Sequence, residues 1–98
     1  MNTERSTRFL MANLGSEVSR ILNWKEKGDM EMAKKCLERA EGILEQVASA
    51  PDMRERREEI TLLKDVIEDL FRPKSVYSVT GYQLKEYFLP FATRIVLA

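Results

Sequence analysis

The clearest structural signal in this chain is residues 10–24, LMANLGSEVSRILNW. Leu10, Leu14, Val18 and Ile21 follow one another at steps of four or three residues. This spacing places apolar side chains on one face of an α-helix, the face that a helix in a globular protein turns toward the core. The pattern predicts an amphipathic helix over about residues 4–27.

Short breaks separate this segment from three others with the same helical periodicity. Gly28 stands where a helix would end, and Asp29 stands where the next helix would be capped. Pro51 suits the first turn of a helix, whereas Pro73 cannot continue one. We therefore expect helices over about residues 4–27, 30–48, 52–71 and 81–96.

The fourth segment carries two further signals. Thr80 and Gln83 have the spacing of a capping box, in which each side chain bonds the free backbone amide of the other residue. Pro90 lies inside the expected helix, where it removes one amide and its ring clashes one turn back. We expect a kink near residues 86–89, or a helix that stops and restarts at Pro90.

The four segments together predict the fold class. Amphipathic helices joined by short connections are favoured as antiparallel neighbours, and 98 residues suffice for one domain with one core. We expect an all-α chain, a single domain over residues 1–98. Its predicted architecture is an antiparallel up-and-down four-helix bundle whose fourth helix is kinked at Pro90.

The composition argues against catalysis and against metal binding. The chain contains no histidine, which is the usual proton shuttle near neutral pH and the commonest metal ligand. Its one cysteine, Cys36, falls on the apolar side of the second expected helix, where a buried small side chain is favoured over a nucleophile. We expect no enzymatic activity, no cofactor and no metal.

Charge is balanced along the chain. Lysine and arginine number 16, as do aspartate and glutamate, and residues 1–50 and 51–98 each carry eight of either sign. A nucleic-acid-binding chain usually has a clustered basic excess instead. The sequence has neither a signal peptide nor an 18-residue apolar run, and one thiol fits a reducing compartment. We expect a cytoplasmic protein that does not enter a membrane.

Three charged residues interrupt the expected apolar faces, and we call them the inward-facing charge cluster. Glu17 lies among the apolar positions of the first helix, and Arg56 and Glu59 lie in the apolar arc of the third. Buried charges need partners, and Glu17 could reach Arg56 from the neighbouring helix. Three interpretations stay open: boundary residues whose charged ends reach water, a structural ion pair, or a ligand site.

The fourth segment also has apolar residues on a second face. Tyr82, Leu89 and Val96 are seven residues apart on the side that should contact water, and Leu97 adds to this surface. A helix that is apolar on two faces is either central to a larger core or half of an interface. We expect a homodimer interface here. The alternative is that the kinked helix wraps both faces onto its own bundle.

Two stretches resemble a known group of proteins. Residues 62–71, LLKDVIEDLF, and residues 84–92, LKEYFLPFA, resemble small prokaryotic all-helical proteins that carry a Tyr-Phe-Leu-Pro-Phe-Ala ending and have no assigned activity. Arg39-Ala40 and Arg56/Arg57 with Glu59 also look similar, so the likeness covers most of the chain. It implies a helical fold and little else.

In outline the architecture is also similar to the HEPN helical domains of toxin–antitoxin and RNA-processing systems. The members that cleave RNA use an Arg-x4-6-His element. A chain without histidine cannot supply that element, so this likeness implies an inactive relative.

These observations leave three functions in different classes. The first is a non-catalytic protein–protein interaction protein, a helical bundle that forms a homodimer or binds another protein. The alternative is a nucleic-acid-associated regulator or an inactive HEPN-like partner of a toxin–antitoxin-type system. That alternative would use four basic residues, Arg54, Arg57, Arg72 and Lys74. The third is an enzyme or small-ligand binder centred on the charge cluster.

Overall fold

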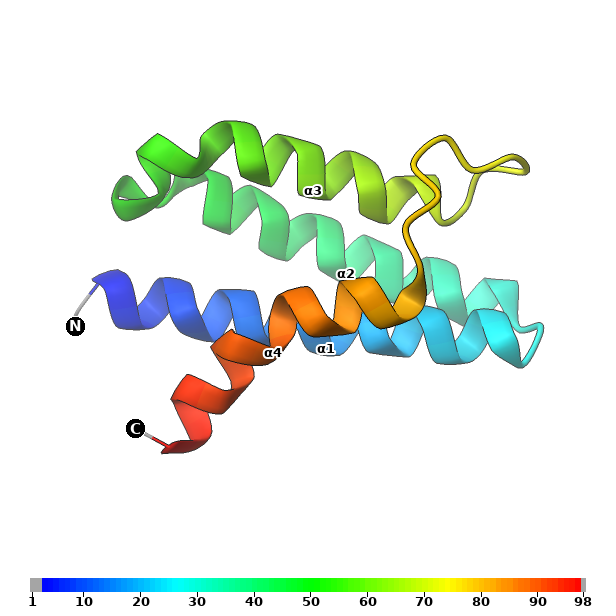
Figure 1. Ribbon diagram of the computed structural model, residues 1–98, viewed down its shortest axis with the longest axis horizontal. Helices are drawn as coiled ribbons and strands as arrows, with labels where there is room; N and C mark the ends of the chain where they lie inside the picture. Colours follow the sequence, from blue (N-terminus) through cyan, green and yellow to red (C-terminus); the bar gives the residue numbers. More distant parts are fainter. Residues whose placement is uncertain (1–2, 98) are drawn as a thin grey trace.

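Four α-helices make up this protein in the computed structural model, which describes the backbone of residues 3–97 and the side chains of residues 7–91. The elements are α1 (Thr3–Glu26), α2 (Met30–Ser49), the 3-10 helix η1 (Pro51–Arg56), α3 (Arg57–Asp69) and α4 (Gly81–Leu97). Figure 1 shows their arrangement, and every regular element in the described range is helical. The prediction of an all-α chain with four helices is confirmed.

The turn between α1 and α2 follows the predicted signals. Gly28 has a φ of 79°, in the left-handed region that glycine adopts without strain. The Asp29 carboxylate accepts a hydrogen bond from the Met32 amide at 3.1 Å and so caps α2. Gly28 therefore lets the chain turn after α1, and Asp29 caps the start of α2.

The third helix differs from the prediction of residues 52–71. The chain first forms η1 over Pro51–Arg56 and becomes α-helical only from Arg57. The α-helix then ends at Asp69, two residues earlier than expected. The predicted single helix is thus a 3-10 turn followed by a shorter α-helix.

Contacts with residues far along the chain explain why a 3-10 helix precedes α3. Thr7 of α1 donates a hydrogen bond to the Asp52 carboxylate at 2.8 Å, and Met53 is buried in the core. Arg56 breaks the helical geometry, with a φ of −108° and a ψ of 14°. Because η1 must satisfy both contacts, it does not share a continuous helix with α3.

The capping box at the start of α4 is confirmed. The Thr80 amide donates to Oε1 of Gln83 at 2.9 Å, and the Gln83 amide donates to Oγ1 of Thr80 at 3.0 Å. Pro90 lies inside α4, and the helical backbone continues past it to Leu97. Figure 1 shows the red end of α4 lying to one side of the other helices.

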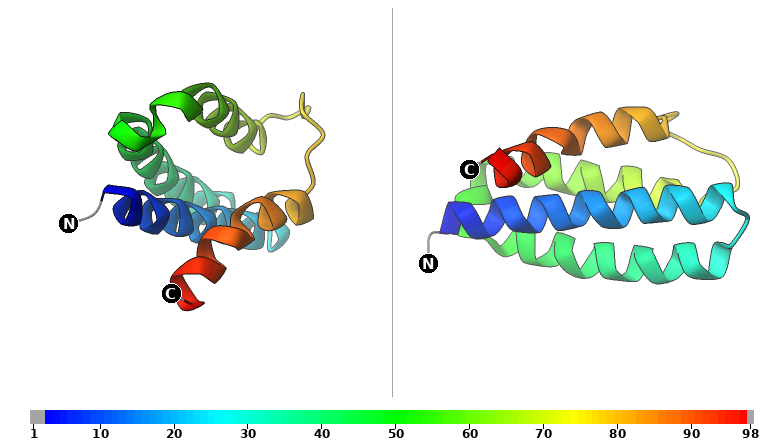
Figure 2. Two further views of the ribbon diagram at one scale, coloured as in Figure 1. Left: turned by 60° about the vertical axis from the view of Figure 1, so that its left-hand side comes forward. Right: turned by 90° about the horizontal axis from the view of Figure 1, so that it is seen from below.

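The packing is centred on α1. This helix packs most extensively against α2 and next against α4, whereas α3 packs against α2 (Figure 2). In the described part of the chain, the backbones of α3 and α4 approach each other at most marginally. The order around the core is therefore α3, α2, α1 and α4, and the side between α3 and α4 is open. The buried core comprises Met11, Leu14, Val18, Ile21, Cys36, Ala40, Leu44, Val47, Met53, Ile60, Leu63, Ile67, Leu84 and Phe88.

Gly15 allows a close approach between α1 and α4. A Cβ atom at this position would lie 2.7 Å from Cβ and 2.9 Å from Cγ of Phe88. Phe88 is itself buried, with 5% of its surface exposed. A residue without a side chain is required here, so Gly15 determines how α4 is seated on α1.

Alanine substitutions at two helical glycines should have opposite effects on stability. Alanine favours a helix interior over glycine by about 0.5–1 kcal/mol. Nothing that the structure describes lies within 4 Å of a Cβ added at Gly42 of α2, so Gly42→Ala should raise the free energy of unfolding by that amount. Gly15→Ala should lower it by about 1–3 kcal/mol, because the methyl group overpacks Phe88.

Urea unfolding followed by circular dichroism measures both free energies. A stabilising Gly15→Ala would contradict the close packing of α4 on α1.

Candidate functional site

Glu17 is a buried carboxylate of α1 that two arginines neutralise. Arg39 of α2 donates to it from Nε at 3.2 Å, and Arg20 donates to it at 2.9 Å. Hydrogen bonding to Glu17 raises the pKa of Arg39. Arg39 also donates to Sγ of Cys36 at 3.1 Å. This group links α1 to α2, and its carboxylate has no charge left uncompensated.

Arg56, Glu59 and Tyr87 form a second polar group. Arg56 donates from Nε to Oε1 of Glu59 at 3.3 Å and from its guanidinium to Oε2, to which the Tyr87 hydroxyl also donates. The hydrogen bond from Arg56, and after it the one from Tyr87, lowers the pKa of Glu59. Burial, together with the hydrogen bond to Glu59, raises the pKa of Tyr87. Since Tyr87 is on α4 and Glu59 on α3, this group bridges the open side.

The structure does not unite the three predicted charges in one cluster. Arg56 and Glu59 meet, but their side chains are 41% and 42% exposed, so they lie at the surface. Glu17 is the one inward-facing member, with 10% of its side chain exposed. Among the described residues, no hydrogen bond or ion pair joins it to the other two. The reason is that Glu17 accepts a hydrogen bond from Arg39 of α2. Glu59 instead accepts hydrogen bonds from Arg56 and from Tyr87 of α4.

A buried aspartate that sequence reasoning missed organises the connection from α3 to α4. The Asp69 carboxylate accepts hydrogen bonds from the Ser75 hydroxyl at 2.6 Å and from Arg72 at 2.9 Å. It also accepts from the backbone amides of Val76 and Tyr77, at 2.9 and 3.2 Å. The bond from Ser75, followed by the one from the Val76 amide, holds the pKa of Asp69 well below its usual range. The carboxylate therefore ties the loop over residues 70–80 to the end of α3.

The position of Asp69 in the helix could have revealed it. An acidic side chain in the last turn of a helix opposes the helix dipole, and the last turn of α3 contains Asp69 and no basic residue. Such an unfavourable placement indicates that a specific partner compensates for it. The amides and the hydroxyl that follow Pro73 are those partners.

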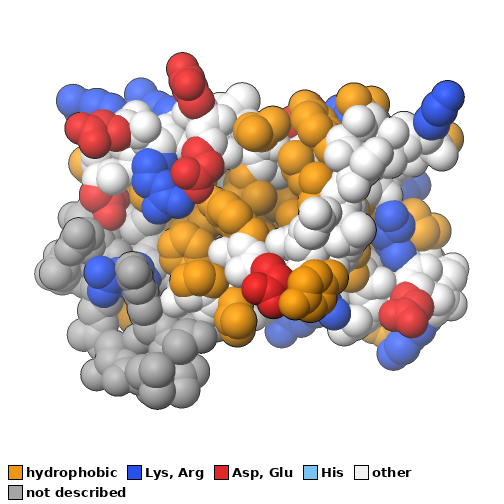
Figure 3. Space-filling model, viewed as in Figure 1, with side chains coloured by type: hydrophobic (Ala, Val, Ile, Leu, Met, Phe, Trp, Pro, Cys, Tyr) orange, Lys and Arg blue, Asp and Glu red, His pale blue; other side chains and the backbone are white. Residues whose placement is uncertain are grey.

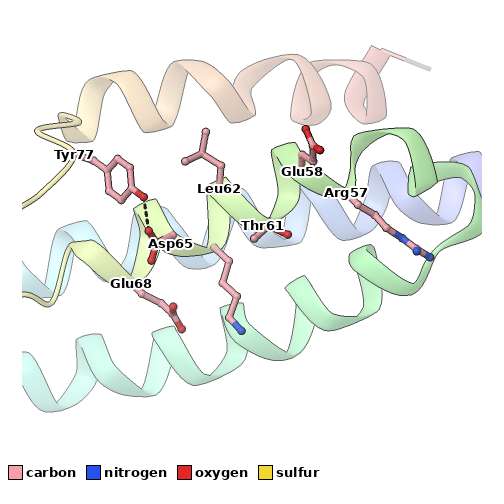
Figure 4. A pocket seen from close by; sticks show the side chains of 8 residues that line it. Arg57, Glu58, Thr61, Leu62, Asp65, Glu68 and Tyr77 are labelled. Carbon is pink, nitrogen blue, oxygen red and sulfur yellow. Dashed lines mark hydrogen bonds between the residues drawn. The ribbon is translucent and has the colours of Figure 1, made fainter.

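A charged hollow of about 570 Å³ lies beside α3. Its lining includes Arg57, Glu58, Asp65 and Glu68 of α3 and Tyr77 of the following loop. In Figure 4 the Tyr77 hydroxyl meets the Asp65 carboxylate, whereas Arg57 and Glu58 point away from one another. The polar ends drawn there do not converge on one point, as the groups of a catalytic site must.

A second depression, which we call the α3–α4 groove, lies on the open side. It has a volume of about 230 Å³. Its apolar lining comprises Leu62, Leu63 and Val66 of α3, Val79 of the loop, and Leu84 and Tyr87 of α4, with Glu59 and Gln83 beside them. Figure 3 shows hydrophobic side chains gathered between these two helices. Sequence reasoning missed this groove, because helical periodicity does not show which neighbour covers a face.

The predicted interface on α4 is exposed where the structure describes it. Tyr82 is 72% exposed and Leu89 is 56% exposed. Helical geometry places both on the side of α4 opposite the buried Leu84. The side chains of Val96 and Leu97, the other two predicted interface residues, lie outside the described residues.

One of the four basic residues of the nucleic-acid hypothesis is neutralised. Arg72 pairs with Asp65 and with Asp69, each at 2.9 Å. Arg54, Arg57 and Lys74 are exposed. Because phosphate binding depends on releasing counterions through uncompensated positive charge, the pairing of Arg72 does not favour its use in a nucleic-acid surface.

These groups have no counterpart to guide their interpretation, since no protein-family model, no curated protein and no solved structure matches this chain. The resemblances to small prokaryotic helical proteins and to HEPN domains stay predictions. Among the described residues, no three cysteine, aspartate or glutamate side chains are placed to hold a metal ion. In the same part of the chain, no helix combines the length and apolar character that crossing a bilayer requires.

Asp69→Asn should reduce stability in a manner that depends on pH. The pKa of Asp69 in the folded protein lies below its ordinary value of 3.8, so its contribution is fully present above that pH and is lost as the pH falls. Asp69→Asn should therefore have a lower free energy of unfolding than the wild type at about pH 7. The difference should shrink toward about pH 2. Urea titrations at both pH values measure it.

The exposed Glu55 provides a matched control. Glu55→Gln removes the same charge from the surface and should change the free energy of unfolding by no more than about 0.5 kcal/mol. If Asp69→Asn lost the same free energy at both pH values, the carboxylate charge would not be what holds the loop.

Proposed function

We propose that this protein is a non-catalytic interaction protein that associates with itself as a homodimer through the face bordered by α3 and α4. The observation that carries the proposal is apolar surface on these two helices. The α3–α4 groove lies between them, and Leu62, Tyr82 and Leu89 are each more than half exposed. Exposed apolar surface of this kind is typical of protein–protein contacts.

The charged groups support binding over catalysis. Two arginines neutralise Glu17, while Arg56 and Tyr87 hold Glu59. A general acid or base needs a carboxyl group that exchanges protons near neutral pH, and the lowered pKa of Glu59 is unsuited to that task. The equal numbers of acidic and basic residues, 16 each, add no net repulsion between two copies.

The proposal includes the finer arrangement of the helices. An antiparallel up-and-down bundle is supported by the short connections from α1 to α2 and from α2 to η1, and by the alternating helix directions in Figure 1. A kink in α4 is supported by Pro90, which has no amide to donate to the carbonyl of Glu86. Such a kink would direct the last part of α4 away from α1.

A cytoplasmic location is part of the same proposal. The single cysteine, Cys36, is buried and free, so two copies would associate without a disulfide. A contact built from apolar side chains is independent of the redox state and suits a reducing compartment.

Multi-angle light scattering should give the mass of a dimer for the wild type, and Leu89→Asp should raise the dissociation constant at least tenfold. A tenfold change corresponds to about 1.4 kcal/mol, and burying an unpaired carboxylate in an apolar contact costs more than that. A wild type that stays monomeric up to about millimolar concentration, where an association of about 4 kcal/mol would be visible, would contradict the proposal.

Met30 supplies the control for lost apolar surface. It is 40% exposed, but it begins α2, far along the chain from α4. Met30→Glu adds a negative charge at a helix N-terminus, where it is tolerated. This variant should keep the dissociation constant of the wild type.

A further inference from the structure

We infer that Glu41 of α2 and Glu68 of α3 form a proton-dependent contact, which holds α3 against α2 more firmly at mildly acidic pH than at neutral pH. The inference is independent of the self-association proposed above, because it concerns the side of α3 that faces α2. We call these two residues the Glu41–Glu68 pair.

The two carboxyl groups meet where α3 packs on α2. The Glu41 and Glu68 side chains form a hydrogen bond with each other, and in Figure 4 Glu68 points from α3 toward α2. Both residues are half-buried. An ionised carboxylate has acceptor oxygens alone, so a hydrogen bond between two carboxyl groups requires a proton on one of them.

The charges around Glu41 offer little compensation for a second negative charge. Lys64 of α3 attracts a negative charge on Glu41, whereas Glu68 of α3 and Glu38 of α2 repel it. Lys64 also lines a crevice of about 240 Å³ between the two helices, together with Glu41 and Glu45. A single lysine thus faces several acids, and the proton is what relieves the repulsion between Glu41 and Glu68.

The charges next to Glu68 on its own side are already paired. Asp65 lies one turn before it and Arg72 one turn after it along the chain. Arg72 donates to Asp65 and to Asp69, each at 2.9 Å. Because these two aspartates hold the guanidinium, Arg72 is not available to neutralise Glu68.

A proton on the Glu41–Glu68 pair stabilises the folded protein. The hydrogen bond to Glu68, followed by burial, raises the pKa of Glu41 above its ordinary value of 4.5. The folded protein therefore binds this proton more tightly than the unfolded chain does. The stabilisation is fully present below pH 4.5 and is lost as the pH rises through the raised pKa, where two carboxylates repel each other.

The helix that this loss affects is α3. It is at one end of the arc of helices, where it packs on α2 and on the preceding η1. Elements with few neighbours open at a lower free energy than the rest of a fold. Since α3 borders the α3–α4 groove, the proton also influences how firmly one border of that groove is held.

Glu41→Gln tests the inference, with Glu45→Gln as its matched control. Glutamine has the shape of a protonated glutamic acid and can donate to Glu68. Glu41→Gln should raise the folding equilibrium constant about two- to fivefold at about pH 8, the range that surface charge pairs give, and leave it nearly unchanged at about pH 4. Glu45→Gln removes the same charge from the same crevice and should raise it at neither pH. Urea unfolding followed by circular dichroism measures these constants.

Glu68→Gln and the double variant complete a cycle. Each single substitution removes the same repulsion, so the double variant should gain no more at about pH 8 than either single variant does. Gains that add fully would show that the two carboxyl groups do not interact, and would overturn the inference. So would a Glu41→Gln protein that is no more stable than the wild type at about pH 8.

Carbon-13 NMR of the glutamate carboxyl groups gives an independent readout. The titration midpoint of Glu41 should lie above 4.5 in the wild type and move toward 4.5 in Glu68→Gln. Amide hydrogen exchange reports on α3, whose protection factors should fall between about pH 5 and pH 8 in the wild type and fall less in Glu68→Gln. A midpoint at or below 4.5 in the wild type, or an equal fall in both proteins, would contradict a proton-dependent contact.

Discussion

The fold of this chain depends on two helices packing against α1. One side of it packs against α2 and another against α4, where Gly15 allows Phe88 so close that one added methyl group would collide. Because α3 packs on α2, the helices form an arc that has α3 and α4 at its ends. Apolar side chains that would meet in a closed bundle, such as Leu62, line an open groove instead. The interface proposed for this protein is a consequence of that arc.

Polar contacts hold α3 and α4, the two ends of the arc, in position relative to each other. Asp69 ties the loop after α3 to the helix it leaves, and Thr80 and Gln83 fix where α4 begins. Across the opening, the Tyr87 hydroxyl donates to Glu59. A groove whose borders are held in this way loses little conformational freedom when a partner binds, which favours affinity. The same contacts occupy the carboxylates of Asp69 and Glu59.

The sequence was sufficient for the helices and their caps, because periodicity and capping are local. Asp29 and Thr80 cap as predicted. It was insufficient for η1, for the partners of Glu17 and for the role of Asp69, since each depends on residues far along the chain or on the path of a loop. A helical wheel identifies the face on which Leu62 lies, but whether that face is covered depends on where α4 is seated.

Isotope-filtered NMR on a mixture of carbon-13-labelled and unlabelled chains tests the central claim most directly. The account predicts intermolecular nuclear Overhauser effects from the methyl groups of Leu62 and Leu89, the exposed leucines of α3 and α4. Spectra in which neither leucine gives an intermolecular signal would show a monomer and contradict the account.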